Sequence, residues 1–292
     1  MKKNRVGLFL VLLLFVGISV LLYPALSQYW NTKTQSRAVA NYQQILESVR
    51  KEDFTAYFEE ADAYNAALNA LEEPLYEYET ITDYRYDDIL NITGNGVFGF
   101  ITIEKLSVEL PVYHGVSDPV LNVACGHLEG SSLPVGGEST HSVLSAHRGL
   151  PHAKLFTDLD KMELGDVFTI TILDRTVTYQ VDQIKVVLPH ETDDVQIIDG
   201  EDHCTLLTCT PYGVNSHRLL VRGTRIENAK PVLYVTSEAF RVDPLVATPV
   251  VAAPILLVLL IVLLLAPVFG GSGKFAKTIF RELINAFKGE NK

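Results

Sequence analysis

The sequence is poor in cysteine, with only Cys125, Cys204 and Cys209 among 292 residues. Three thiols are too few for a disulfide scaffold, and their odd number leaves at least one unpaired. Basic residues are also scarce: 24 Lys and Arg stand against 35 Asp and Glu, a net charge of −11. This balance argues against nucleic acid as a partner, because binding phosphates needs a basic surface. No group of side chains has the spacing of metal ligands, so we expect neither a metal nor a cofactor.

Charge is absent from two long hydrophobic runs, residues 6–26 and 249–269. Each is long enough to cross the hydrocarbon core of a bilayer. A cleaved signal peptide is the alternative for the first run, because Ala25–Ser27 fits a cleavage pattern; a retained helix is favoured because the run exceeds a usual signal core. The flanks 1–5 and 270–292 are basic, which predicts that both termini are cytoplasmic. The chain is thus expected to be a two-helix membrane protein whose middle lies outside the cell.

The tail 270–292 contains apolar residues at four-residue spacing among its lysines. It is either an amphipathic helix on the inner leaflet or a simple anchor. The part between the two ends holds 16 basic and 33 acidic residues, a net charge of 16 minus 33, or −17. This acidic middle strengthens the argument against nucleic acid.

Residues 27–95 form an N-terminal segment with helical patterns. The stretches 38–49 and 54–71 have apolar residues at helical spacing. After Pro74 the chain is rich in tyrosine and shows no clear helical face up to residue 92. We therefore expect a long covering segment rather than a separate domain.

Residues 96–228 consist of short β-branched and aromatic runs separated by Gly, Pro and Asp. Seven or eight such runs predict a mainly β domain, either a closed barrel or a sandwich. One helical pattern, residues 152–162, interrupts them. Residues 229–248 would link this domain to the second membrane run.

The stretch HCTLLTCTPYGVNSHRLLVRG places Cys209 at the end of one apolar run and Arg218 in the next. If the two runs are the arms of a hairpin, Arg218 lies opposite Cys209. Arg222 has the same facing but lies about 13 Å farther along the strand, at about 3.3 Å per residue. A guanidinium beside a thiol favours the thiolate and can stabilise an oxyanion. Cys209 is therefore the candidate nucleophile, with Arg218 beside it.

Such a nucleophile needs an acid/base partner, and the chain offers eight histidines. His217 faces away from Cys209, and His203 lies about 20 Å along the same strand. His147 ends the strand-like run HSVLSAH, so its side chain projects from a strand end. Active-site residues often occupy such positions, but spacing alone does not decide between His147 and the remaining histidines.

The run TLLTCTPYGVNSHR resembles the signature of sortases, the cysteine transpeptidases of Gram-positive cell surfaces, and LSAHRGLP resembles their histidine motif. The longer run GHLEGSSLPVGGESTHSVLSAHRGLPHAKLFTDLDKMELGD is similar to the pilus-polymerising class, class C. The layout with two membrane anchors is also similar to that of class C. The resemblance covers about residues 96–227 and implies an eight-stranded closed sortase-type β-barrel.

The resemblance also implies a chemistry. Cys209 would attack the threonine carbonyl of an LPXTG-like sorting signal and form a thioester. Arg218 would bind the oxyanion, and His147 would protonate the leaving glycine amine and deprotonate the incoming amine. In class C enzymes this amine belongs to a pilin lysine, so an isopeptide bond polymerises pili. The alternatives are a housekeeping-type sortase that joins surface proteins to a peptidoglycan amine and a non-catalytic surface barrel that binds peptides.

One feature departs from class C, whose N-terminal lid usually places an Asp-Pro-aromatic motif in the active site. That motif is absent from the N-terminal segment, where Pro74 follows a glutamate. Asp83 and Tyr84 are a possible substitute plug, in which Asp83 would pair with Arg218 and Tyr84 or Tyr86 would cover the thiol. The alternative is that this segment simply packs against the barrel.

Overall fold

The computed structural model describes residues 2–49 and 54–228. Contacts divide the chain into two units, and within the described ranges the boundary falls between residues 25 and 26. One helix in the described ranges is long and apolar enough to cross a membrane, and it runs from Leu12 to Ser48. The second predicted membrane run, the linker before it and the basic tail lie outside the described residues.

Eight strands form a closed barrel in the order β1-β2-β3-β4-β7-β8-β6-β5, which confirms the barrel that the family resemblance implied and excludes the sandwich. The β2–β3 and β4–β7 pairs are parallel, and the remaining pairs are antiparallel. The strands are β1 (Val97–Ile103), β2 (Val108–His114), β3 (Cys125–His127), β4 (Thr140–Ser145), β5 (Val167–Ile172), β6 (Arg175–Val187), β7 (Asp202–Thr210) and β8 (His217–Ile226).

Four α-helices and several 3-10 turns accompany the barrel within the described ranges. The two patterns predicted as helices correspond to the end of the first helix and to the second. The α-helices are α1 (Lys2–Ser48), α2 (Phe54–Asn69), α3 (Pro74–Glu77) and α4 (Asp118–Leu121), and the 3-10 turns are Tyr78–Thr80, Tyr86–Asp88, Glu104–Leu106, Leu159–Lys161 and Asp193–Val195. The predicted helix over residues 152–162 is wrong, because only the turn Leu159–Lys161 is helical there.

Alternation explains why the strands close around one core. In β5 the side chains of Phe168, Ile170 and Ile172 are buried, and the residues between them face outward. Burying each such side chain stabilises the fold by about 1.5–3 kcal/mol. In β7 residues 203–206 are all buried, so both faces of this strand are covered along that stretch.

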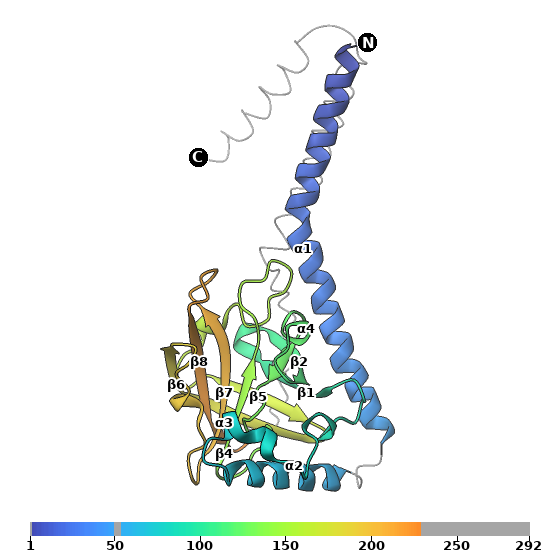
Figure 1. Cartoon of the computed structure of the whole chain (residues 1–292). Coiled ribbons are helices and arrows are strands. Elements are labelled where there is room, and N and C mark those ends of the chain that lie inside the picture. Colours follow the sequence, from blue (N-terminus) through green and yellow to red (C-terminus); the bar gives the residue numbers. More distant parts are fainter. Residues whose placement is uncertain (1, 50–53, 229–292) are drawn as a thin grey trace, which may run out of the picture. The chain divides into compact units, whose positions relative to one another are not determined.

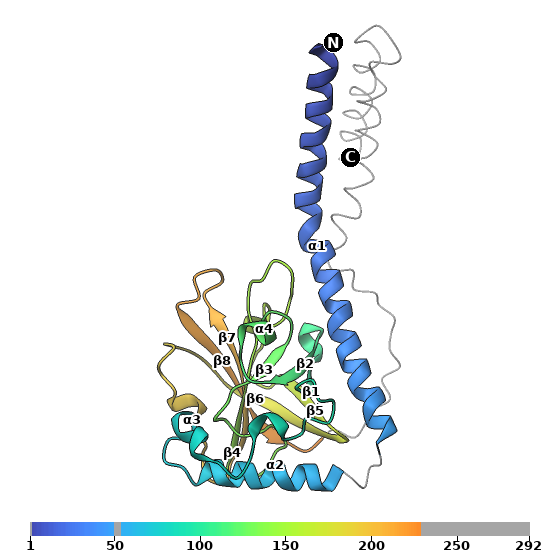
Figure 2. The ribbon, with the colours of Figure 1, turned by 45° about the vertical axis from the view of Figure 1, so that its right-hand side comes forward.

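Helix α2 lies across one end of the barrel, and the β7–β8 loop lies at the opposite end (Figures 1 and 2). Its apolar face, with Phe58, Tyr64 and Leu68, belongs to the same core as the barrel interior. The side chain of Asn65 exchanges hydrogen bonds of 3.1 and 2.7 Å with the backbone of Leu133. The helix thus seals the barrel end that faces away from the β7–β8 loop.

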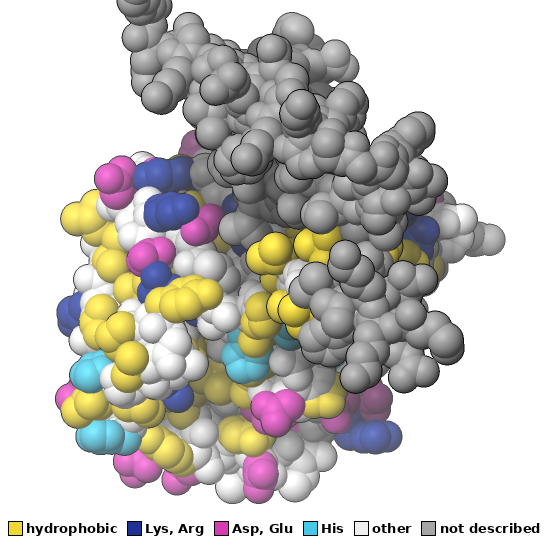
Figure 3. Space-filling model, turned by 90° about the horizontal axis from the view of Figure 1, so that it is seen from above, with side chains coloured by type: hydrophobic (Ala, Val, Ile, Leu, Met, Phe, Trp, Pro, Cys, Tyr) yellow, Lys and Arg dark blue, Asp and Glu magenta, His cyan; other side chains and the backbone are white. Residues whose placement is uncertain are grey.

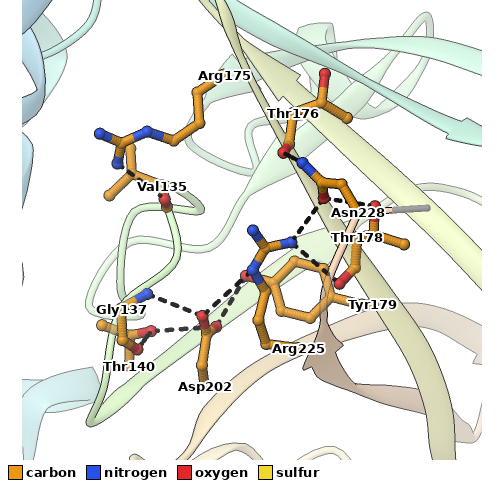
Figure 4. Close-up of polar contacts among 10 residues, drawn as sticks. All are labelled: Val135, Gly137, Thr140, Arg175, Thr176, Thr178, Tyr179, Asp202, Arg225 and Asn228. Atoms are coloured by element: carbon orange, nitrogen blue, oxygen red, sulfur yellow. Dashed lines mark hydrogen bonds and ion pairs between the residues drawn. The ribbon is translucent and has the colours of Figure 1, made fainter. Parts of the chain in front are cut away.

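At this sealed end Asp202 fixes the start of β7 (Figure 4). Its carboxylate accepts hydrogen bonds from the Gly137 amide at 2.9 Å and the Tyr179 hydroxyl at 3.0 Å, and it faces Arg225 at 3.9 Å. Arg225 and Asn228 in turn bond to β6, at Thr178 and Thr176. A cavity of about 690 Å3 opens here, between α2 and the loop 135–140. Asp202 lies about 26 Å from Thr210 at the other end of β7, at about 3.3 Å per residue.

Candidate active site

The β7–β8 hairpin brings Cys209 and Arg218 together. The two residues are direct partners in the antiparallel register, and Arg222 pairs with Thr205 instead, as the sequence predicted. The loop between the strands closes through hydrogen bonds of 3.0 Å from the amides of Val214 and Asn215 to the Pro211 carbonyl. Directly opposed side chains in an antiparallel pair lie within about 5.5 Å at Cβ. The guanidinium is therefore within reach of the thiol.

The two arginines of this strand face differ in their partners. Arg222 is bound by the Asp182 carboxylate through two hydrogen bonds, at 3.1 and 2.5 Å. Arg218 donates only to backbone carbonyls of its own hairpin, at Asn215 and His217. Within the part of the chain that the structure describes, no carboxylate forms an ion pair with Arg218. Its charge is thus free to bind an anionic group that arrives beside Cys209.

His147 follows β4, which is the parallel neighbour of β7. The residue before it is fixed to β7 on both sides of the peptide: the Ala146 amide donates to the Leu207 carbonyl at 3.2 Å, and the Thr208 hydroxyl donates to the Ala146 carbonyl at 2.8 Å. The carbonyl of His147 accepts the Phe156 amide at 3.2 Å. The imidazole is thus carried by a backbone that is bonded to the strand of Cys209.

Cys209, His147 and Arg218 line one cavity of about 480 Å3. Its walls are mostly apolar and come from β7, β8 and the β6–β7 loop, with Val187, Leu188, Pro189, Val195, Leu207 and Leu220. Figure 3 looks onto the barrel end of the β7–β8 loop, where hydrophobic side chains and histidines gather. A largely apolar pocket with a few convergent polar groups suits an extended peptide whose carbonyl must be held beside a nucleophile.

The β6–β7 loop is fastened by a histidine that sequence reasoning did not single out. His141 of β4 bonds to the Gln196 carbonyl and to the Thr205 hydroxyl, both at 2.7 Å. Burial lowers the pKa of His141 to about 4, so the ring is neutral and can donate through one nitrogen and accept through the other. This contact holds one wall of the cavity in place. The alternation in HSVLSAH predicts the strand, but it does not predict that His141 bonds to the β6–β7 loop.

Asp83 and Tyr84 do not belong to this cavity, and here the plug interpretation differs from the structure. Asp83 is exposed, and Tyr84 packs edge-on against Tyr64 of α2 with ring centroids 6.3 Å apart. Tyr86 is anchored as well, because its hydroxyl bonds to His127 Nδ1 at 2.7 Å and accepts the Gly115 amide at 3.1 Å. The tyrosine-rich stretch therefore packs against α2 through Tyr84 and against the barrel through Tyr86.

Helix α3 reaches the cavity instead. Leu75 and Tyr76 line it together with Cys209. Leu75 also packs against a small apolar cluster, Val143, Val195 and Leu220, beneath the cavity. Gly130 permits this close approach, since a Cβ there would lie 2.8 Å from the Leu75 Cα and 2.9 Å from the Pro74 carbonyl oxygen. The only proline of the N-terminal covering segment thus begins the short helix that lines the cavity of the thiol.

The sortase domain family model matches residues 101–226. Sortase C1 from Streptococcus agalactiae has a solved structure that is 46% identical, with a TM-score of 0.60, and the match covers 66% of this chain and 100% of that one. The chain belongs to the sortase family. Sortase C from Streptococcus pneumoniae is 42% identical, with a TM-score of 0.57, and the match covers 67% of this chain and 100% of that structure.

A more distant curated relative is sortase A from Streptococcus agalactiae serotype III (strain NEM316). It is 24% identical over 142 residues, which is 46% of this chain and 57% of the relative. This sortase thus spans less than two thirds of the length of that relative. The stronger likeness is to the sortase C structures.

The three cysteines of this sortase occupy different environments. Cys125 and Cys204 are buried inside the barrel, and Cys209 is half-buried at the cavity; all three are free thiols. Burial raises the pKa of both the Cys125 and the Cys204 thiol. Since the thiolate is the reactive form, the two interior thiols are inert in the folded protein.

We therefore expect iodoacetamide to modify Cys209 alone in the native protein. Reaching the other two thiols requires opening the core, which costs up to the full free energy of unfolding. Intact mass after brief alkylation should show one adduct, assigned to Cys209 by peptide mapping, and three adducts in denaturant. Native modification of Cys125 or Cys204 at a comparable rate would contradict the assignment of the interior thiols.

Proposed function

We propose that this chain is a class C sortase, a cysteine transpeptidase that joins pilins through isopeptide bonds. The observation that carries the proposal is the direct pairing of Cys209 with Arg218 in a cavity that His147 shares. A nucleophile, an acid/base and an unpaired cation at one apolar cavity are the groups that acyl transfer from a peptide requires.

The Cys209 thiolate attacks the threonine carbonyl carbon of an LPXTG-like signal. Arg218 stabilises the oxygen that becomes negative in the tetrahedral intermediate. When the intermediate collapses, the bond to the glycine nitrogen breaks and His147 supplies the proton to the leaving amine. A thioester joins the threonine to Cys209. An incoming amine then attacks this carbonyl, His147 takes its proton, and the thiolate departs.

A pilin lysine is the proposed acceptor amine. Support comes from the sortase C relatives, one of which is described in terms of pilin substrate specificity. The housekeeping alternative, transfer to a peptidoglycan amine, has weaker support because the sortase A relative is only 24% identical. The proposed partners are therefore sorting-signal proteins, an acceptor pilin and the lipid bilayer. No nucleic acid, metal or cofactor enters this scheme.

We further propose that the domain faces the cell exterior between two membrane anchors, with both termini cytoplasmic. The apolar helix Leu12–Ser48 supports the first anchor. The basic flanks support the orientation. Anchoring on the outer face places the cavity where secreted, membrane-tethered substrates pass.

The test combines the full chain in detergent micelles with a purified pilin that ends in an LPXTG-like signal. A ladder of covalent multimers with lysine isopeptide links, identified by denaturing gel and mass spectrometry, is the expected product. Cleaved pilin without a ladder, but with transfer to added peptidoglycan-type amines, would favour the housekeeping role. Intact pilin under both conditions would favour the non-catalytic barrel.

We also propose that α3, which lines the cavity with Leu75 and Tyr76, limits access to the Cys209 thiol. Replacing Gly130 with alanine would press a Cβ against the backbone of Leu75 and Pro74. Such overpacking costs about 1–3 kcal/mol. Because the cost falls only on the closed arrangement, we expect peptide turnover and Cys209 alkylation to rise by at least about 5-fold.

The matched control is Gly200→Ala. Gly200 has a φ of +78°, close to the +80° of Gly130, but a Cβ there meets nothing within 4 Å. It carries the same backbone strain without touching α3, so its rates should stay at the wild-type level. Unchanged alkylation and turnover in a folded Gly130→Ala protein would mean that α3 does not limit access.

A further inference from the structure

Two short segments run side by side at the candidate site, residues 146–148 after β4 and residues 208–210 at the end of β7. Each has a proposed catalytic residue at its centre, His147 in one and Cys209 in the other. Contacts link the segments on both sides of these central residues. On one side, the Thr208 hydroxyl donates to the Ala146 carbonyl at 2.8 Å. That bond lies before His147, so it does not tie the chain after His147 to β7.

Arg148 supplies the contact on the other side. Its Nη1 donates to the Thr210 hydroxyl at 3.2 Å, and its Nη2 donates to the Asp160 carboxylate at 2.6 Å. The guanidinium fork thus joins the residue after His147 to the residue after Cys209. Flanking bonds to Thr208 and Thr210 bracket the pair, so the His147 backbone cannot rotate away from β7 without breaking one of them.

The environment of Arg148 indicates that its fork is held in place rather than loosely exposed. The side chain is only 10% exposed, compared with 48% for Asp160. Its Nε is buried and has no hydrogen-bond partner within the part of the chain that the structure describes. Burying a guanidinium is costly unless a carboxylate neutralises it, and Asp160 does so here. The free energy of desolvating Arg148 is thus offset by its ion pair with Asp160.

Arg148 does not line the cavity that contains Cys209, His147 and Arg218. Its two terminal nitrogens, Nη1 and Nη2, donate to Thr210 and Asp160. It therefore has neither the position nor the free charge to bind the substrate carbonyl, which separates its role from that of Arg218. A second contact follows the same path: a Cβ on Gly149 would lie 3.0 Å from the ring of Tyr212, so this ring lies against the backbone after Arg148.

We propose that Arg148 is a positioning residue, which holds the His147 segment at the distance from Cys209 that proton transfer requires. The inference rests on the proposed transpeptidase function. It assigns to Arg148 an effect on the rate of the chemical steps and not on peptide binding. Displacing a catalytic group by about 1 Å lowers a rate by about 100-fold.

The test compares Arg148→Gln with Thr210→Val in the full chain in micelles. Arg148→Gln removes the whole bridge, and Thr210→Val removes only its acceptor and leaves the Arg148–Asp160 pair in place. Both should lower kcat for peptide transfer by about 10- to 100-fold. KM for the peptide should stay within about threefold, and the alkylation rate of Cys209 should match the wild type. Arg148→Lys should regain part of the loss, because an ammonium can reach one acceptor but has no fork.

A control for general disruption is Arg175→Gln. Arg175 is an exposed arginine that donates to a backbone carbonyl, at Val135, and it lies at the sealed end of the barrel, away from Cys209. Its kcat should be unchanged. The inference is overturned if folded Arg148→Gln and Thr210→Val proteins keep the wild-type kcat, or if only KM rises. If Arg148→Gln does not fold, Thr210→Val decides alone. Failure of the proposed function would look different, since the wild type itself would then show no transfer.

Discussion

Replacing Cys209 with alanine will abolish acyl transfer and leave the barrel folded. The thiol is the only group at the cavity that can form the thioester, so its loss should lower kcat by at least about 1,000-fold. Cys209 is half-buried at a strand end. Its truncation should therefore change the free energy of unfolding by less than about 1 kcal/mol. The measurement is peptide transfer to a lysine amine by the full chain, read by mass spectrometry, with thermal unfolding recorded beside it.

The matched control is Cys204→Ala in the same strand. Cys204 is fully buried in the barrel interior, so its truncation should cost about 1 kcal/mol of stability through the cavity it leaves. Its kcat should remain at the wild-type level. The two variants thus separate activity from stability. Transfer by Cys209→Ala, or loss of transfer in folded Cys204→Ala, would contradict the assignment of the nucleophile.

Arg218→Lys should have the second largest effect, a fall in kcat of about 100- to 1,000-fold. A lysine keeps the charge but loses the planar guanidinium. The guanidinium can donate to an oxyanion and to the hairpin carbonyls at the same time, and an ammonium has fewer donors for both. Those carbonyls are at Asn215 and His217. Transfer kinetics on the same peptide would measure the loss. KM should rise less than kcat falls, because the oxyanion exists only after attack.

Arg222→Lys provides the comparison, because the two arginines share a strand and a facing. Arg222 pairs with Thr205 and is engaged by Asp182, so its replacement should leave kcat within a few-fold of wild type. Equal losses from both substitutions would mean that the effect is one of general charge on this face. Wild-type turnover by Arg218→Lys would remove Arg218 from the oxyanion role.

The longer strands could be predicted because their signals are local. Alternation in β5 and the long run of β6 mark strands by themselves, and the hairpin register that joins Cys209 to Arg218 follows from counting residues across one turn. Closure of the sheet did not follow from the number of strands, which left a sandwich equally open, and was implied only by the family resemblance. The three residues of β3 could not be recognised, because a strand of that length is defined by its neighbours β2 and β4.

The errors occurred where tertiary contacts override local pattern. Residues 152–162 have a helical pattern, but the chain there must return from His147 to the barrel. Lys154 Nζ donates to the Leu106 carbonyl at 2.7 Å, and the Phe156 amide donates to the His147 carbonyl at 3.2 Å. These contacts with residues outside the segment stabilise successive turns in place of a helix.

The covering segment shows the same limit. Asp83 and Tyr84 were chosen because an acid beside an aromatic matches a plug, and composition alone cannot tell a plug from packing. In the structure Tyr84 packs against Tyr64 of α2 and does not line the cavity of Cys209, so this part of the segment is packing and not a plug. The bridge from Arg148 to Thr210 was equally hidden, because its two ends are 62 positions apart in the chain.

The most direct test of the account is the mass of the enzyme during turnover. The full chain in micelles would be mixed with an LPXTG-like peptide, quenched in acid, and examined by intact mass spectrometry and peptide mapping. The account predicts an adduct equal to the peptide up to its threonine, bound to Cys209 and released by an added amine. A peptide that is cleaved while Cys209 carries no adduct, or an adduct on another residue, would contradict it.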